Sequence, residues 1–242
     1  MKGRAMYRFC RLPLNFDVER LRADLEIAQR QEWTLHFVPQ NYEGEWSAIP
    51  LQSIGGAIDH LYSDPAARPD EFKPTPILER CPCFQETLAA FQCDITSARL
   101  LKLAAGSVIK EHTDLDLSVE SGVVRLHIPI TTHPDVEFYV EEERAVMEPG
   151  SCWYLDATLP HRLNNPTDVD RVHIVFDCVM NDWLRERFQE GGFMPREKGA
   201  LEQKGIREED LPAVIAALRG MGTEVGERMA RELESDLGSV AL

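Results

Sequence analysis

Long hydrophobic runs are missing from this sequence. No segment of the 242 residues approaches the roughly eighteen consecutive apolar residues that a membrane-spanning helix needs. The basic segment Met1–Arg8 is not followed by the apolar stretch of a secretory signal peptide. From these two absences we expect no transmembrane helix and a cytoplasmic location.

Positive charge is scarce. The chain has 26 Lys and Arg against 41 Asp and Glu, which gives a formal net charge of −15 at pH 7. Sequence-independent binding to nucleic acid or to an anionic membrane needs a basic face. The charge balance therefore argues against both partners and leaves an enzyme or a binding protein.

Paired cysteines are also absent. None of the six cysteines belongs to a C-x-x-C motif, so neither a zinc knuckle nor a thioredoxin-type site is indicated. Cys81-Pro82-Cys83 is too tight for an ordinary disulfide, and Cys152 and Cys178 lie in predicted strands as reduced structural thiols. At 43% hydrophobic residues, a chain of this length can bury a full core without such cross-links.

The chain changes character twice along its length. Residues 17–31 have helical periodicity with Asp17 as N-cap, and the proline-rich residues 63–82 predict a long surface loop, a candidate lid. Residues 97–179 hold five short β-type runs separated by turn residues, which indicates an antiparallel sandwich or barrel. After residue 182 the pattern is helical. We predict a domain over 1–182, with its core at 97–179, and a small helical appendage over 183–242.

The sequence His112-Thr113-Asp114 carries the strongest chemical signal. Its imidazole and carboxylate stand at i and i+2 near a strand end, so both project to one face. His161 follows another predicted strand. Two histidines and one carboxylate form a facial triad that suits Fe(II) and leaves coordination positions open for a chelating co-substrate and O2.

Charged residues inside apolar strands strengthen this interpretation. Arg171 opens the apolar run Val172–Phe176, where a barrel-lining guanidinium could hold the distal carboxylate of a dicarboxylate such as 2-oxoglutarate. A solvent-facing arginine on an edge strand is the alternative. Arg125 and His127 share one face of the strand 123–130, and its other face is apolar. They could contact a co-substrate or substrate, and His173 is either a further lining group or structural.

Seven short segments, taken together, resemble a known family. In chain order they are His112–Asp114, Arg125–Ile130, Pro149–Trp153, Asp156, Pro160-His161, Asn164-Asn165 and Arg171–Asp177. With them, residues 98–179 resemble the aspartyl/asparaginyl β-hydroxylase family, and Glu45–Leu51 resembles an upstream segment of it more weakly. Animal members carry glycine where this chain has Asp114, so the resemblance is to the smaller bacterial, proline-hydroxylating branch.

The resemblance implies a fold, an activity and a set of roles. The fold is mainly β, with a double-stranded β-helix (jelly-roll, cupin-like) core and flanking helices. The activity is that of an Fe(II)- and 2-oxoglutarate-dependent dioxygenase using O2. By the match, His112, Asp114 and His161 hold iron, and Arg171 pairs with the distal carboxylate of 2-oxoglutarate. His127 and Arg125 contact the co-substrate or substrate, and Arg125 and Trp46 are the candidate substrate contacts.

Several alternatives remain open at this point. The main expectation is hydroxylation of a free amino acid or a small derivative, with proline as the first substrate to test. The alternative is an Asp or Asn β-hydroxylase acting on a peptide or a carrier-tethered residue. From other classes come a cupin-like binding protein without turnover and a cupin enzyme without co-substrate. A tryptophan in an apolar strand is more often a core residue than a substrate contact, which is the alternative for Trp46. The C-terminal helices could make a homodimer contact, and His36, His60 and His133 are expected to be surface or structural residues.

Overall fold

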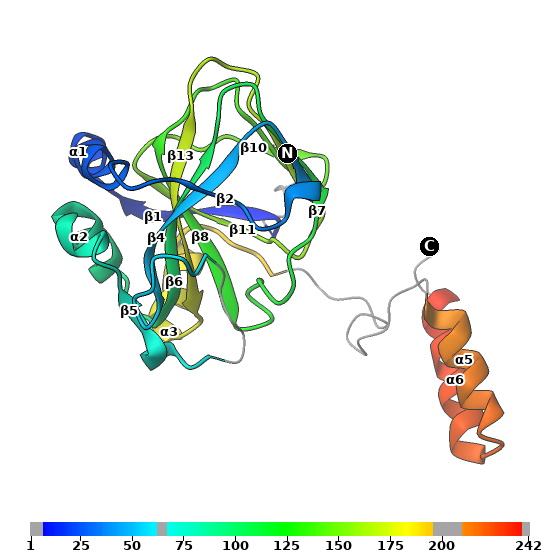
Figure 1. Ribbon diagram of the computed structural model, residues 1–242. Coiled ribbons are helices and arrows are strands. Elements are labelled where there is room, and N and C mark those ends of the chain that lie inside the picture. The colour runs from blue at the N-terminus through cyan, green and yellow to red at the C-terminus, as the bar shows by residue number, and fades with distance from the viewer. Residues whose placement is uncertain (1–6, 62–66, 196–209, 239–242) are drawn as a thin grey trace. The chain divides into compact units, whose positions relative to one another are not determined.

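The computed structural model describes residues 7–61, 67–195 and 210–238, with side chains up to residue 234. The chain divides into two compact units, Met1–Pro195 and Arg196–Leu242 (Figure 1). Among the described residues, no helix combines the length and the apolar character that crossing a membrane requires.

An antiparallel sheet forms one wall of the first unit (Figure 1). Its strands follow the order β1-β11-β8-β13-β6-β4-β2, and β5 pairs with β4 beside this path. The bounds are β1 Phe9–Asn15, β2 Thr34–Leu35, β4 Trp46–Ile54, β5 Phe72–Pro74, β6 Ile95–Leu103, β8 Val123–Thr131, β11 Ser151–Leu155 and β13 Arg171–Val179.

A second antiparallel sheet faces the first. Its order is β10-β9-β12-β7-β3. The bounds are β3 Tyr42–Glu43, β7 Val108–His112, β9 Glu137–Val140, β10 Glu143–Ala145 and β12 His161–Asn164. Leu103 and Leu155 of the large sheet share one apolar cluster with Phe138 and Leu163 of the small sheet. Two facing antiparallel sheets confirm the mainly-β jelly-roll prediction.

The main core lies on the outer face of the large sheet. In β8, Val124, Leu126, Ile128 and Ile130 are fully buried there. Three helices cover this face: α1 (Val18–Ala28), α2 (Pro82–Ala89) and α3 (Asp182–Glu190). Because side chains alternate along a strand, Arg125 and His127 of β8 point to the opposite face, between the two sheets.

Two helix starts have the capping chemistry that their sequences suggest. Asp17 Oδ1 accepts hydrogen bonds from the backbone N–H groups of Glu19 and Arg20 at 3.0 and 3.2 Å, which confirms the predicted cap of α1. Asn181 caps α3 in the same way by accepting from the Leu184 N–H at 3.0 Å. These caps fix the residue at which each helix begins.

The proline-rich segment differs from the prediction. Its described part folds into the 3₁₀ turns Pro69–Glu71 and Leu78–Arg80, the strand β5 and the start of α2. The long surface loop is therefore wrong for these residues. Phe72 and Ile77 are buried, and Pro69 and Pro82 open helical turns, a position that proline suits. Residues 63–66 of the predicted loop lie outside the described residues.

The boundary between the two units also differs from the predicted one after residue 182. Leu184 and Phe188 of α3 are buried in the main core, so this helix belongs to the β unit, which ends at Pro195. The second unit contains the predicted helices α5 (Leu211–Gly220) and α6 (Glu224–Gly238), which pack together. They meet closely at Gly226, where an added Cβ would stand 2.3 Å from the Leu218 carbonyl oxygen.

Candidate functional site

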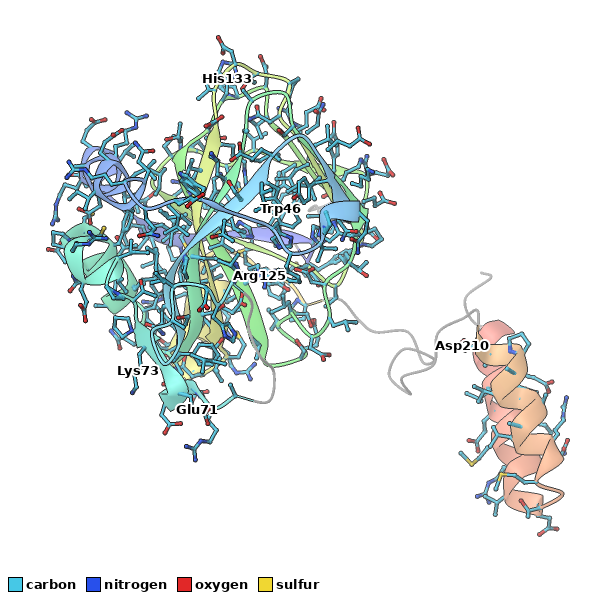
Figure 2. The ribbon with its side chains drawn as sticks, viewed as in Figure 1. Trp46, Glu71, Lys73, Arg125, His133 and Asp210 are labelled. Atoms are coloured by element: carbon cyan, nitrogen blue, oxygen red, sulfur yellow. The ribbon has the colours of Figure 1, made fainter. Side chains whose placement is uncertain are left out.

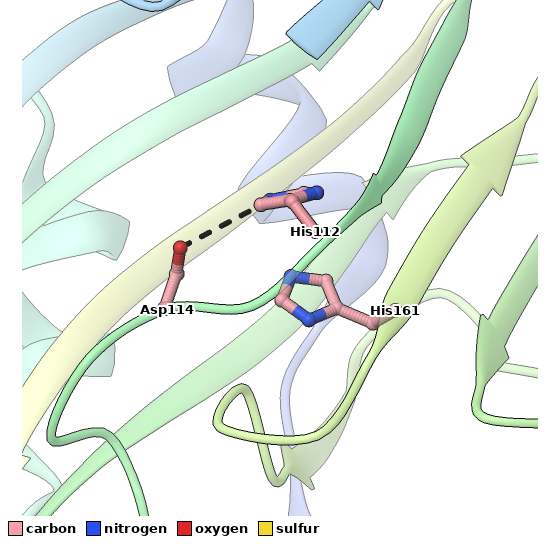
Figure 3. A group of neighbouring side chains, drawn as sticks. All are labelled: His112, Asp114 and His161. Atoms are coloured by element: carbon pink, nitrogen blue, oxygen red, sulfur yellow. Dashed lines mark ion pairs between the residues drawn. The ribbon is translucent and has the colours of Figure 1, made fainter. Parts of the chain in front are cut away.

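Strand pairing brings the two predicted histidine ligands together. His161, at the start of β12, is in register with His112, at the end of β7, and their ring centroids lie 4.2 Å apart. Asp114 follows β7, where its backbone N–H donates to the Ala157 carbonyl at 2.8 Å. One ligand atom from each of the three side chains lies within 4.8 Å of the others (Figure 3).

Backbone contacts orient both imidazole rings. Nδ1 of His112 lies 2.8 Å from the Lys110 carbonyl, and Nδ1 of His161 lies 2.9 Å from the Leu159 carbonyl. Because a carbonyl oxygen only accepts, each Nδ1 carries the proton and each neutral ring keeps its lone pair on Nε2. Burial, together with the neighbouring His112, lowers the pKa of His161 to about 4, which favours the neutral form that binds metals.

A cavity of about 590 Å³ connects these residues to the other predicted site residues. All seven predicted residues line it: Trp46, His112, Asp114, Arg125, His127, His161 and Arg171. The sequence analysis therefore selected residues that the fold gathers in one place. What each of them binds stays a prediction at this point.

At one end of the cavity lies a buried arginine without an anionic partner among the described residues. Arg171 is 3% exposed, and its Nη2 lies 2.9 Å from Nδ1 of His173. Its guanidinium carbon stands 5.6 Å from the centre of the Phe138 ring. Burial lowers the pKa of Arg171 below its ordinary value. Nearby, Nδ1 of the buried His127 has no hydrogen-bond partner within the described part of the chain.

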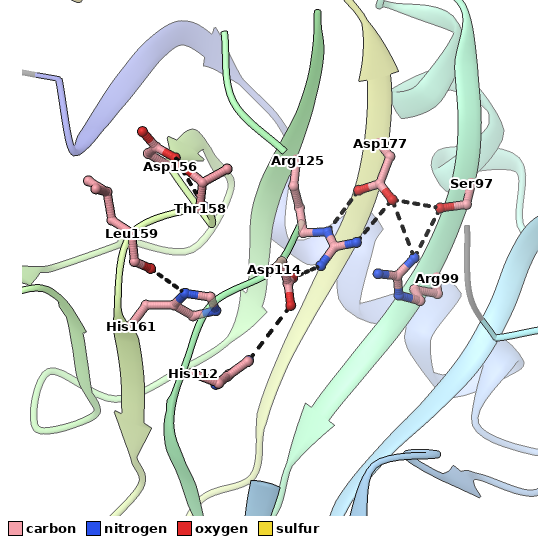
Figure 4. A network of polar contacts seen from close by, with 10 residues as sticks. All are labelled: Ser97, Arg99, His112, Asp114, Arg125, Asp156, Thr158, Leu159, His161 and Asp177. Atoms are coloured by element: carbon pink, nitrogen blue, oxygen red, sulfur yellow. Dashed lines mark hydrogen bonds and ion pairs between the residues drawn. The ribbon is translucent and has the colours of Figure 1, made fainter. Parts of the chain in front are cut away.

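At the other end, Arg125 is held by carboxylates (Figure 4). Its Nε and Nη2 donate to the two oxygens of Asp177 at 2.8 and 3.0 Å, and its Nη1 donates to Asp114 Oδ2. Asp177 is fully buried and also accepts from the Ser97 hydroxyl at 3.1 Å. Arg99 joins the network by donating to Ser97 Oγ at 3.0 Å.

Among the lining residues that the sequence analysis did not select are Arg99 and His36. Arg99 is buried in β6, and His36 stacks on Trp46 with ring centroids 3.5 Å apart, so His36 is not merely a surface residue. Figure 2 labels Trp46 and Arg125, which both lie between the sheets. An arginine inside the apolar strand 95–103 is the same signal that indicated Arg171. No pattern in the sequence indicated His36.

The described part of the proline-rich segment, from residue 67 onward, does not line the cavity. Leu61, which precedes this segment in the sequence, lines the cavity. The described residues of this segment therefore give no support to the predicted lid.

Comparison with known proteins adds independent information. The family model for aspartyl/asparaginyl β-hydroxylase matches residues 15–181. An L-proline cis-4-hydroxylase from Rhizobium meliloti (strain 1021) is 24% identical over 235 residues, which covers 94% of this chain and 79% of that protein.

Solved structures are more distant. HygX from Streptomyces hygroscopicus, with nickel and 2-oxoglutarate bound, is 13% identical over 73% of this chain and 84% of its own, with a TM-score of 0.46. A Pseudomonas putida prolyl-4-hydroxylase is 11% identical over 73% of this chain and 95% of its own, with a TM-score of 0.43. The family model spans well over half of the sequence, including all the predicted site residues, and the chain therefore belongs to the aspartyl/asparaginyl β-hydroxylase family.

Proposed function

We propose that this protein is an Fe(II)- and 2-oxoglutarate-dependent dioxygenase that hydroxylates an unactivated C–H bond of a free amino acid or a small amino-acid derivative. The observation that carries the proposal is the pairing, in one cavity, of a two-histidine, one-carboxylate cluster with a buried arginine that has no carboxylate partner among the described residues. The name of the R. meliloti relative makes L-proline the first substrate to test.

The donor set fits ferrous iron. His112 and His161 each offer Nε2, and Asp114 offers a carboxylate oxygen, all close enough to surround one ion. Three protein ligands of this type leave adjacent positions for a bidentate 2-oxo acid and for O2. With iron and co-substrate bound, the site supplies oxidative decarboxylation: substrate C–H, 2-oxoglutarate and O2 yield substrate C–OH, succinate and CO2.

The inner end of the cavity fits the distal carboxylate of 2-oxoglutarate. Arg171 is buried, charged and without a carboxylate partner in the described residues, so an incoming carboxylate would supply the missing counter-charge. Nδ1 of His127, which has no hydrogen-bond partner in the described part of the chain, offers a further contact nearby. A dicarboxylate co-substrate satisfies both features, whereas a co-substrate-free cupin enzyme would leave Arg171 unexplained.

The charge at the other end supports a substrate with a carboxylate. Once Asp114 binds the metal, Arg99 and Arg125 together face the single carboxylate of Asp177, which leaves one positive charge in excess. Burial and the charge of Arg125 lower the pKa of Arg99 to about 10, a sign of this shortage of negative charge. Trp46 adds an aromatic surface beside His112, one of the three candidate metal ligands.

Succinate formation from 2-oxoglutarate tests the proposal. The purified protein is assayed with Fe(II), ascorbate and O2, without substrate, with each free amino acid, and with Asp- or Asn-containing peptides. Stimulation by a free amino acid, L-proline first, is the expected result. Stimulation by peptides alone would move the substrate to the peptide alternative, and no turnover under any condition would favour a binding protein.

Two substitutions link that turnover to the candidate metal site. His112→Ala and His161→Ala should each abolish Fe(II)-dependent succinate formation. His133→Ala is the matched control, because His133 lies outside this cavity and pairs with Asp135 at the surface. Retained activity in both cavity variants would place the metal elsewhere.

A further inference from the structure

The partner of Arg171 is a neutral side chain. Arg171 and His173 stand two residues apart on β13, so they share one face of the strand, and Arg171 Nη2 lies 2.9 Å from His173 Nδ1. No carboxylate among the described residues lies within salt-bridge distance of Arg171. His173 is 1% exposed and, unlike Arg171, does not line the cavity.

The hydrogen bond determines the tautomer of His173. A guanidinium group has donors only, so Nδ1 of His173 must accept, and the proton of the neutral ring sits on Nε2. Burial, and then the charges of Arg171 and His127, lower the pKa of His173 well below its usual value. The ring of His127 stands edge-on to that of His173, with ring centroids 6.0 Å apart, and Nε2 of His173 has no hydrogen-bond partner in the described residues.

Because its acceptor is the neutral His173, Arg171 is in a different state from an arginine paired with a carboxylate. His173 satisfies one N–H of Arg171 and fixes the direction of the guanidinium group, yet it leaves the positive charge unneutralised. Phe138 covers the group from another side at 5.6 Å. An aspartate at position 173 would instead form an internal ion pair, and the arginine would then have little remaining attraction for a ligand carboxylate.

We propose that His173 is a positioning residue that holds Arg171 toward the cavity as an unneutralised cation, and thereby makes the site selective for a 2-oxo acid with a second carboxylate. This inference rests on the proposed function, because it takes 2-oxoglutarate as the ligand. It adds a residue that acts through Arg171 and has no contact of its own with the metal ligands.

The test compares two ligands that differ only at the distal end. Calorimetry on the Ni(II)-loaded, full-length protein gives the Kd of 2-oxoglutarate and the Kd of 2-oxopentanoate, which lacks the second carboxylate. The ratio of the two values isolates the contribution of that carboxylate. For a buried arginine–carboxylate pair we expect a ratio of roughly a hundred or more in the unmodified protein.

Three substitutions at position 173 should separate in this ratio. His173→Phe keeps the ring but removes the acceptor, so the ratio should fall about tenfold, the usual worth of a hydrogen bond to a charged group. His173→Asp should bring the ratio close to one. His173→Asn, which retains an acceptor near the Nδ1 position, should stay within about threefold of the unmodified protein.

Binding of 2-oxopentanoate and of Ni(II) should stay the same in all three variants, and this controls for folding. If His173→Phe does not fold, the near-isosteric Asn and Asp variants still decide the question. Equal ratios in the Asn and Asp variants, or an equal loss of both ligands, would overturn the role of His173. A ratio near one in the unmodified protein would instead refute Arg171 as the distal carboxylate site, and with it this part of the proposed function.

Discussion

The two ends of the cavity hold the same residue type in opposite electrostatic states. Arg125, on β8, is bound by both oxygens of Asp177 and by Asp114. Arg171, on the adjacent strand β13, contacts the neutral His173 and the Phe138 ring and has no carboxylate partner among the described residues. Both guanidinium groups are largely buried between the sheets.

The difference appears in the pKa values. Burial alone would lower the pKa of Arg125, but the charges of Asp177 and Asp114 outweigh it and raise that pKa above its ordinary value. At Arg171 no charge from the described residues opposes burial, and the pKa falls to about 9. Arg125 is therefore part of the internal charge balance of the fold, whereas Arg171 has no counter-charge among the described residues. An uncompensated buried charge costs stability and is typical of a binding site.

The largest expected effect comes from removing Asp177, the carboxylate that balances the charge at the Arg125 end of the cavity. Asp177→Leu leaves Arg125 and Arg99 buried with no carboxylate from β13, and it should lower the free energy of unfolding by about 3–5 kcal/mol. Urea unfolding followed by circular dichroism measures this change. Asp135→Asn, at an exposed carboxylate, is the control and should stay within about 0.5 kcal/mol. A loss below about 1 kcal/mol at Asp177 would show that this network is not structural.

The second prediction concerns a substitution that removes the positive charge of Arg171. If Arg171 binds the distal carboxylate as proposed, Arg171→Met should weaken 2-oxoglutarate binding to the Ni(II)-loaded protein by about 2–5 kcal/mol, because that carboxylate loses the cation paired with it. The free energy of unfolding without ligand should change by less than about 1 kcal/mol, since the relief of a buried charge offsets the hydrogen bond lost at His173.

Calorimetry and urea unfolding on the same Arg171→Met sample give both numbers. A large loss of stability with unchanged affinity would reverse the comparison and make Arg171 the structural arginine. Equal losses of stability in Arg171→Met and Asp177→Leu would remove the distinction between the two ends.

Local chemistry made part of this site predictable from the sequence. His112 and Asp114 stand only two residues apart at the end of β7, so both can reach one ion. A charge at the start of the apolar strand 171–179 indicated Arg171. The cap at Asp17 and the buried face of β8 follow from equally local patterns. These features depend on residues only a few positions apart, where geometry leaves few choices.

Long-range pairing could not be predicted in this way. His161 reaches His112 only through the register of β12 against β7. Asp177 reaches Arg125 only because β13 pairs with β8 in a register that sets those two residues opposite each other. The placement of α3 in the main core depends in the same way on distant partners.

The smallest expected effect comes from removing the Ser97 hydroxyl, which lies between Asp177 and Arg99 at the Arg125 end of the cavity. The Ser97 hydroxyl donates to Asp177 Oδ2 at 3.1 Å and accepts from Arg99 Nη1 at 3.0 Å. Ser97→Ala removes both bonds but leaves the two-point contact between Arg125 and Asp177, so unfolding should become easier by about 1 kcal/mol. Binding of 2-oxoglutarate should be unchanged, because Ser97 lies at the Arg125 end. A shift in that affinity as large as the one from His173→Phe would show that the two ends are coupled rather than independent.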